Sequence, residues 1–303
     1  MALNPSDQDK RGVLLVNFDG SYSSAYPNGD KPNNPAPTYT PFSNFNFNGT
    51  NGNSASQAEF SPEPDQSPNN SLTYSNDIAG PFGETINAKQ SMVGQGNRFF
   101  GGTFLDGSAL TIANNTDLWI RAFHYFPTAF CAGFDLGTDE GSDGSGNLKL
   151  IRWAFGAAGD RMTAQLSNFA NSACSTTMEQ RFFTTEIANA TGGGEFNLPS
   201  PVTIPRDQWV ALQWRIRFSE TDTGFVQAWM HDTYLGQISN IATKPVGDDI
   251  LNDLTYGNYY NGAPHQAVDW YIQSIIATQQ TPNTLDSGGR PYIAPTTQVG
   301  DFV

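Results

Sequence analysis

Polar and apolar positions alternate strictly in two runs between Trp209 and His231, and a short polar turn separates the runs. The apolar row consists of Val210, Leu212, Trp214, Ile216 and Phe218 in the first run and Val226, Ala228 and Met230 in the second. Side chains repeat with a period of two along a β-strand. The pattern therefore predicts a β-hairpin whose apolar row faces a core.

The opposite face of this hairpin gathers cations, amides and aromatic rings. A guanidinium pairs with a carboxylate, an amide bonds to hydroxyls, and an indole covers the apolar face of a sugar. We expect a carbohydrate-binding face that also includes Arg121, from the run DLWIRAFHYF. The members of this face are Arg121, Gln213, Arg215, Arg217, Gln227 and Trp229. The alternative is a solvated outer face without a ligand.

The same alternation recurs along most of the chain and predicts an all-β protein. Further strands are expected at 12–19, 84–93, 98–105, 108–114, 117–126, 148–157, 161–169, 180–187, 232–238, 254–260 and 267–278. Clusters of Gly, Asn, Asp and Ser separate them, as is typical of turns. Residues 245–254 are expected to form one short helix. No internal repeat is evident, which argues against a propeller or a β-helix.

The composition predicts three regions. Residues 1–77 hold the first strand and an Asn-, Pro- and Ser-rich arm or loop, residues 78–295 form the β-sandwich, and residues 296–303 form a C-terminal tail. We expect GGRPYIAPTTQVGDFV, the last sixteen residues, to act as a surface strap. Aromatic residues in the arm favour packing on a neighbouring subunit or on its own domain; they are Tyr39, Phe42, Phe45, Phe47 and Phe60.

Composition and charge narrow the class of function. Of the 303 residues, 38% are hydrophobic and only 15% are charged, which favours short strands joined by polar loops. The net charge is −14 and long basic patches are absent, so we expect no nucleic-acid partner. An acidic substrate would need a local cationic patch to overcome the long-range repulsion.

The sequence also bears on location. No stretch approaches the roughly 20 apolar residues of a transmembrane helix, so we expect no membrane insertion. The N-terminal run lacks the charged and hydrophobic regions of a signal peptide. Two explanations stay open: a mature secreted protein without its leader, or a protein that leaves the host inside a virus particle. Both predict an extracellular or virion-surface location.

The acidic residues, histidines and cysteines bear on metal and disulfide chemistry. The loop Asp135–Asn147 carries four acidic residues and could hold Ca²⁺, but it does not match the EF-hand pattern. The three histidines lack the paired spacing of a zinc site. We therefore expect no cofactor and no metal, with calcium at 135–147 as the alternative. Whether Cys131 and Cys174 pair stays open.

The strand sequences resemble a known family of folds. The runs WVALQWRIRF, TGFVQAWMHDTYLGQI, LTYGNYYNG and AVDWYIQSIIAT are similar to the concanavalin A-like jelly rolls of polysaccharide lyases and of laminarin- and heparin-type sugar binders. The resemblance covers about residues 80–295. It implies a jelly-roll sandwich of two antiparallel sheets, here with a long polar N-terminal arm, and a polysaccharide or surface glycan as partner.

Several family motifs are missing. No Gly follows Asp232 in the Trp229–Asp232 run, where the family has W-x-(D/N)-G. The E-x-D-x-E signature of jelly-roll hydrolases is absent, and a glycoside hydrolase needs two facing carboxylates. The Arg-Glu-Arg strand that is typical of alginate lyases is absent too. Any enzyme of this fold is therefore expected to be a lyase and not a hydrolase.

Three hypotheses follow, and whether the protein is an enzyme stays open. The first is a non-catalytic glycan-recognition or surface-display protein in an external assembly such as a phage virion, self-associating through its N-terminal arm. The second is a polysaccharide lyase that cleaves a uronate polymer by β-elimination, with Lys149 and Gln227 as possible partners of its catalytic residues. The third is a purely structural virion protein. The catalytic residues expected of the lyase are His231, Tyr259, Tyr260 and Arg215.

Overall fold

The computed structural model describes fourteen stretches of the chain. They are residues 37, 41, 43–53, 61–62, 71–92, 98–103, 110–132, 148–155, 160–167, 179–184, 194–196, 204–260, 267–298 and 301. The expected strand at 12–19, much of the expected arm, the acidic loop 135–147 and Cys174 lie outside these residues.

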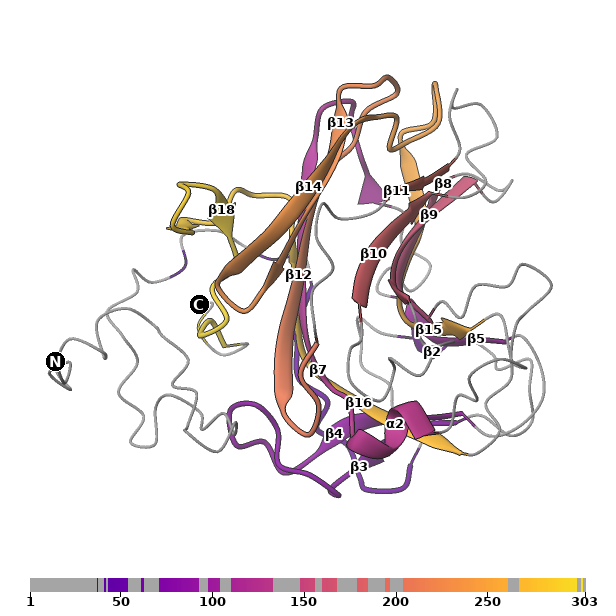
Figure 1. Ribbon diagram of the computed structural model, residues 1–303, viewed down its shortest axis with the longest axis vertical. Helices are drawn as coiled ribbons and strands as arrows, with labels where there is room; N and C mark the ends of the chain where they lie inside the picture. The colour runs from indigo at the N-terminus through magenta and orange to yellow at the C-terminus, as the bar shows by residue number, and fades with distance from the viewer. Residues whose placement is uncertain are drawn as a thin grey trace, which may run out of the picture.

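Two antiparallel sheets form the two layers of the molecule (Figure 1). The first sheet has the order β14 (Thr233–Ile241), β13 (Gly224–Met230), β12 (Trp209–Arg217), β7 (Asp117–Tyr125), β16 (Val268–Thr278), β4 (Asn87–Met92) and β3 (Ser71–Ser75). The short β1 (Ser43–Phe45) also pairs with β16. The first sheet thus joins strands that are distant in sequence.

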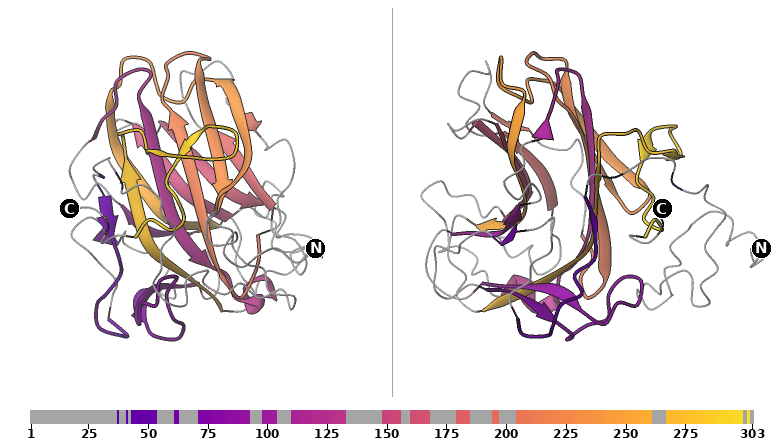
Figure 2. Two further views of the ribbon diagram at one scale, coloured as in Figure 1. Left: turned by 90° about the vertical axis from the view of Figure 1, so that its left-hand side faces the viewer. Right: turned by 180° about the vertical axis from the view of Figure 1, so that it is seen from behind.

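The second sheet lies against the first. Its order is β11 (Gly194–Phe196), β10 (Glu179–Thr184), β9 (Asp160–Ser167), β8 (Leu148–Phe155), β15 (Ile250–Tyr260), β5 (Arg98–Thr103) and β2 (Ser61–Pro62), and β6 (Leu110–Thr111) also pairs with β15. This sheet bends so that its outer side, turned away from the first sheet, is concave (Figure 2). A separate hairpin of β17 (Thr284–Leu285) and β18 (Pro291–Tyr292) lies on the outer side of the first sheet.

The core between the sheets is built from the apolar rows of the strands. All five predicted residues of β12 and its end, from Val210 to Phe218, have a relative exposure of 0%. The second sheet contributes Ile151, Trp153 and Leu254, which belong to the same buried cluster. The alternation in the sequence therefore identified the core face correctly, and the predicted all-β sandwich is confirmed.

The expected helix at 245–254 is wrong. Ile250 begins β15, which pairs with β8 on one side and with β5 and β6 on the other. Those backbone partners outweigh the weak helical pattern of a ten-residue segment. The helix that the described residues do contain is α2 (Thr128–Ala132), whose first backbone N–H donates to the Asp207 carboxylate. No helix in the described part of the chain is long and apolar enough to span a membrane.

Parts of the expected N-terminal arm belong to the sandwich. Phe47 is buried in the core, and the Gln273 side chain forms hydrogen bonds with both its backbone N–H and its backbone carbonyl. The Gln273 Oε1 accepts a hydrogen bond of 2.6 Å from the Phe47 N–H, and its Nε2 donates one of 3.0 Å to the Phe47 carbonyl. Together with β1 and β3, this contact ties residues before position 78 to the first sheet.

Candidate functional site

The C-terminal segment, residues 284–298, crosses the outer face of the first sheet, in agreement with the expected surface strap (Figure 1). The Trp119 indole N–H donates to the Pro291 carbonyl at 3.1 Å. The Gln213 Oε1 accepts a hydrogen bond of 3.0 Å from the Ile293 N–H. Trp119, Ile276 and Ile293 also form a small apolar cluster under the segment. The central part of this face is therefore covered by the protein's own chain.

Arg121 is the central anchor of the C-terminal segment. Its relative exposure is 0%. Its Nη1 donates to the carbonyls of Ala294 and Thr297 at 2.7 and 2.6 Å, and its Nη2 donates to the Ser274 hydroxyl at 3.1 Å. A charged donor makes stronger hydrogen bonds than a neutral one. This guanidinium therefore binds backbone carbonyls of the same chain.

Trp229 is buried at the edge of the same covered region. Its indole N–H donates to the Asp286 carboxylate at 2.8 Å, and its ring stacks on Tyr292 with centroids 6.3 Å apart. The same carboxylate pairs with Arg290. The structure thus has Arg121, Gln213 and Trp229 beneath the C-terminal segment, where the sequence led us to expect an open face for a glycan. Alternation shows that a side chain faces away from the core, but not what covers it.

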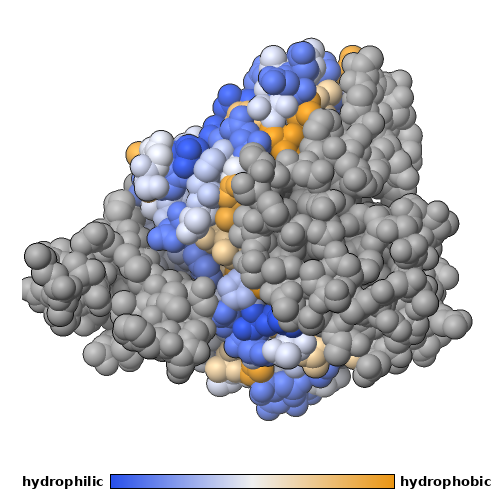
Figure 3. All heavy atoms as spheres, in the orientation of Figure 1, coloured by the Kyte–Doolittle hydropathy of each residue, from blue (hydrophilic) through white to orange (hydrophobic). Residues whose placement is uncertain are grey.

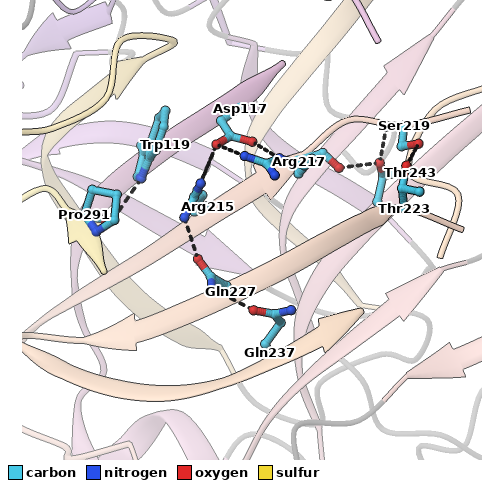
Figure 4. A network of polar contacts seen from close by, with 10 residues as sticks. All are labelled: Asp117, Trp119, Arg215, Arg217, Ser219, Thr223, Gln227, Gln237, Thr243 and Pro291. Atoms are coloured by element: carbon cyan, nitrogen blue, oxygen red, sulfur yellow. Dashed lines mark hydrogen bonds and ion pairs between the residues drawn. The ribbon is translucent and has the colours of Figure 1, made fainter. Parts of the chain in front are cut away.

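The two other predicted arginines bind one carboxylate of the protein itself (Figure 4). Asp117 accepts from the Arg215 Nη2 at 2.5 Å and from the Arg217 Nε at 2.7 Å. Arg215 also donates to Gln227 at 3.2 Å. The hydrogen bond from Arg217 to Asp117 raises the pKa of Arg217. Asp117 therefore occupies the role that the carboxylate of an acidic sugar was expected to play.

His231 lies in the turn between β13 and β14 of the first sheet, with a left-handed backbone at φ 56°. Its N–H donates to the Ala211 carbonyl at 2.8 Å. Burial lowers the pKa of His231 to about 4, so the imidazole is neutral at pH 7. Tyr259 and Tyr260 belong to β15 in the second sheet. His231 and Arg215 therefore belong to the first sheet, whereas both tyrosines belong to the second.

The second sheet aligns a different set of chemically active residues. Lys149 lies directly opposite Tyr259 on one side and opposite Gln165 on the other, and Gln165 lies opposite Arg181. Residues directly opposite each other on antiparallel strands share a face of the sheet. Arg181, Gln165, Lys149 and Tyr259, here called the second-sheet row, therefore form one line across β10, β9, β8 and β15.

The second-sheet row lies on the outer, concave face. Ile151 and Trp153 are core residues, so Arg152 between them lies on the other face. Arg152 is opposite Thr163, and Gln165 follows Thr163 by two positions on the same strand. Gln165 and its partner Lys149 therefore share the outer face. Lys149 and Arg152 are three positions apart, a spacing that would place them on opposite faces of a regular strand. They share a face because the register shifts by one residue between Lys149 and Ile151.

The pairing also distinguishes the two neighbouring tyrosines. Tyr256 pairs with the core residue Ile151, and the register between β15 and β5 is regular from Thr255 to Tyr260. Positions 256, 258 and 260 thus lie on the core side of β15, whereas 255, 257 and 259 lie on the outer side. The second-sheet row contains Tyr259 and not Tyr260. Sequence reasoning named Lys149 and Tyr259 but missed Gln165 and Arg181, because their strands are paired through a register that alternation does not reveal.

Among the residues that the structure describes, no group of His, Cys, Asp or Glu could hold a metal ion. The second-sheet row itself consists of amine, phenol, amide and guanidinium groups. Those groups can neutralise a carboxylate and transfer protons.

Solved structures share this architecture. The chain is similar to the endo-β-1,4-glucuronan lyase from the fungus Trichoderma reesei, with a TM-score of 0.52, 10% identity, and coverage of 80% of this chain and 96% of that chain. The fold is a concanavalin A-like jelly roll. An alginate lyase from Aplysia kurodai has a TM-score of 0.45 and 9% identity, with coverage of 72% of this chain and 90% of that chain. An alginate lyase from Chlorella virus has a TM-score of 0.43 and 8% identity, with coverage of 73% of this chain and 93% of that chain.

No family model matches the sequence of this jelly roll, and no curated protein sequence matches it. The resemblance stated from the strand sequences is thus confirmed at the level of the fold. At 10% identity the likeness to the glucuronan lyase concerns the fold alone.

Proposed function

We propose that the protein is a polysaccharide lyase that cleaves a uronate-containing polymer, with its active site on the outer face of the second sheet. The observation that carries the proposal is the alignment of Arg181, Gln165, Lys149 and Tyr259 in one row across four strands. The jelly-roll fold shared with a glucuronan lyase supports it.

The residue types of the row match the needs of β-elimination. The reaction removes the proton at C5 of a uronate, forms the C4–C5 double bond, breaks the bond between C4 and the glycosidic oxygen, and protonates that oxygen. A guanidinium and an amide, from Arg181 and Gln165, neutralise the carboxylate and so make the C5 proton more acidic. Tyr259 and Lys149 are directly opposite neighbours, about 5 Å apart at their Cβ atoms. They act as the base and acid of the reaction.

The size and charge of this face suit a polymer. Adjacent strands lie about 4.8 Å apart, so a row across four strands extends for about 14 Å. Arg152 lies on the same face as Lys149 and Arg181, as the pairing with Thr163 indicates. Three cations on one face form the local patch that an acidic polymer needs when the chain as a whole carries a net charge of −14.

The non-catalytic hypothesis predicts the same face but no turnover. Binding without cleavage would follow if the row held a glycan but lacked the geometry for proton transfer. A role in a virus particle, as a decoration or structural protein, has no supporting observation in the described part of the structure. Self-association through the N-terminal arm likewise has none there, and two pieces of that arm contribute to the sandwich of their own chain.

The test is a screen of purified protein on alginate, glucuronan, heparin-type and pectic polymers. It follows the ultraviolet absorbance of unsaturated uronate and, in parallel, retention of the protein on each polymer. We expect rising absorbance on at least one polymer. Retention without absorbance would make the protein a binding module. The absence of both retention and absorbance would refute the proposal.

A matched pair of lysine variants locates the activity. Lys149→Met removes the amine of the row and is expected to lower kcat/KM at least about 100-fold. Lys89→Met removes an amine of the first sheet that pairs with Asp77 and Asp269, and it is expected to keep full activity. Equal activity of the two variants would mean that the row is not the active site.

A further inference from the structure

Three aromatic side chains and a lysine form a line across one end of the first sheet. Trp209 is directly opposite Tyr125, Tyr125 is opposite Tyr271, and Tyr271 is opposite Lys89. These four residues, here called the first-sheet row, belong to β12, β7, β16 and β4. Adjacent strands lie about 4.8 Å apart, so the row extends for about 14 Å.

The first-sheet row lies on the outer face, beyond the part that the C-terminal segment covers. Val210, Trp270 and Ile272 are core residues, so their neighbours along the strands lie on the other face. Arg121 anchors the C-terminal segment, and Tyr125 follows it by four positions, about 13 Å along β7. Figure 3 shows hydrophilic and hydrophobic residues side by side near β3 and β4, at the lower end of the sheet.

The row leaves one tryptophan partly open to solvent. Of the six tryptophans, all of which lie in described stretches, five have a relative exposure of 1% or less, whereas Trp209 is half-buried. Its indole N–H donates to the Ala79 carbonyl at 2.6 Å. The half-buried ring of Tyr125 lies edge to face with those of Trp209 and Tyr271, at centroid distances of 5.7 and 5.9 Å. These contacts fix the orientation of the Trp209 ring.

Two accessible carboxylates lie at the lysine end of the row. Lys89 pairs with Asp77 at 2.9 Å and with Asp269 at 3.0 Å, and these two side chains are 49% and 38% exposed. Asp77 also accepts a hydrogen bond of 3.1 Å from the Tyr271 hydroxyl. Each carboxylate therefore keeps acceptor capacity for a hydroxyl from outside the protein.

A third carboxylate lies near the tryptophan end. Burial and the negative charge of Asp207 both raise the pKa of Tyr125. Asp207 is exposed and accepts hydrogen bonds from the backbone N–H and the hydroxyl of Thr128. In the described part of the chain, the charged groups that act on the two tyrosines of the row are thus three carboxylates and the ammonium of Lys89. The surroundings of the row are acidic.

We propose that the first-sheet row binds a neutral polysaccharide, with one sugar ring lying against Trp209. An indole covers the C–H face of a sugar, and carboxylates accept hydrogen bonds from its hydroxyls. The same carboxylates repel the acid group of a uronate. This site differs from the second-sheet row in its sheet and in the charge of its ligand. It goes beyond the proposed lyase function, because it attaches the protein to a glycan that it does not cleave.

The test is acrylamide quenching of tryptophan fluorescence in the wild-type protein. Since the other five tryptophans are buried, the quenching reports on Trp209. The neutral probes are laminarin, xylan and galactomannan, and alginate is the acidic probe. We expect at least one neutral polymer to lower the Stern–Volmer constant at least about twofold, because a bound sugar covers the indole. Alginate is expected to leave it unchanged.

A matched pair of aromatic variants locates the binding. Trp209→Ala is expected to weaken binding of the protecting polymer at least about 10-fold in calorimetry, since one aromatic anchor commonly dominates such a contact. Phe225→Ala is the control, because Phe225 is also a half-buried ring of the first sheet but lies against Arg215 and Arg217. Its affinity should stay within about twofold of the wild type. If Trp209→Ala does not fold, the quenching of the wild type decides.

Three results would overturn the proposal. One is unchanged quenching with all three neutral polymers, and another is equal affinity of the two variants. The third is protection by alginate, which would mean that an acidic polymer occupies the row. Lys149→Met should still bind the neutral polymer. A protein that cleaves no uronate polymer but shows protection by a neutral one would refute the lyase function alone.

Discussion

Arg121 donates a hydrogen bond of 2.6 Å to the backbone carbonyl of Thr297, 176 residues further along the chain. The contact joins the middle of β7 to the C-terminal segment and buries the guanidinium completely. A cation that looks like a ligand-binding residue in the sequence is thus a structural anchor. The C-terminal segment covers the central part of the outer face of the first sheet, which favours the second sheet as the face for the proposed function.

Replacing Arg121 tests this anchoring role. Hydrogen bonds to charged groups contribute about 1.5–3 kcal/mol each, and Arg121→Met also leaves the Ala294 and Thr297 carbonyls without this donor. We expect the free energy of unfolding in urea to fall by about 3 kcal/mol or more. Limited proteolysis should cut the C-terminal segment faster than in the wild type.

Arg217→Met is the control for that measurement. Arg217 is on the same face, but its side chain is 36% exposed, and Arg215 still pairs with Asp117 in its absence. A loss of about 1 kcal/mol or less is expected. Equal losses for the two variants would mean that Arg121 does not anchor the segment.

The pH dependence of stability should contain a contribution from His231. Burial lowers its pKa in the folded protein from 6.5 to about 4. The unfolded chain therefore takes up a proton near pH 6.5 that the folded protein refuses until about pH 4, and stability falls as the pH drops through that window. Because of His231, the free energy of unfolding of the wild type should fall by about 2 kcal/mol between pH 7 and pH 5.

The variant His231→Asn removes this titration while keeping a residue that tolerates the left-handed backbone at φ 56°. Urea unfolding at pH 7 and pH 5 should show a smaller drop in stability for the variant. His124 is fully buried and has a pKa of about 3, so part of the pH dependence will persist in both proteins. Identical drops in the two proteins would show that His231 is not buried as described.

Gln90 offers a test of the core. Its side chain is fully buried and faces Trp270 across the strand pair, and within the described part of the chain its amide oxygen and nitrogen have no hydrogen-bond partner. An unpaired buried polar group costs about 1–3 kcal/mol. Gln90→Met, which has nearly the same shape, should therefore raise the free energy of unfolding by about 1 kcal/mol or more. A lower free energy of unfolding in the variant would mean that ordered water satisfies the amide.

Much of the fold could be predicted because it follows local rules. The hairpin from Trp209 to Met230 and its core row obey the period of two, and the structure reproduces both. The segment around Ile250 was misjudged because a ten-residue apolar pattern does not distinguish a helix from a strand. Pairing with β8 and β5 makes that choice, and pairing is not a local property.

The candidate site could be predicted only in part. Lys149 and Tyr259 were candidates by residue type, but more than 100 positions separate them, and their alignment depends on the order of strands in the sheet. The shift beside Lys149 also reverses the expected alternation in β8. The face of Arg121 was misread because the segment that covers it lies more than 160 residues away in the sequence.

The most direct test of the central claim compares two adjacent phenol groups on opposite faces of β15. Tyr259→Phe removes a hydroxyl from the second-sheet row, and Tyr260→Phe removes one from the core side. On the polymer that the wild-type protein cleaves, we predict that Tyr259→Phe lowers kcat at least about 100-fold and that Tyr260→Phe stays within about twofold of the wild type. Full activity in Tyr259→Phe would contradict the assignment of the active site to this face.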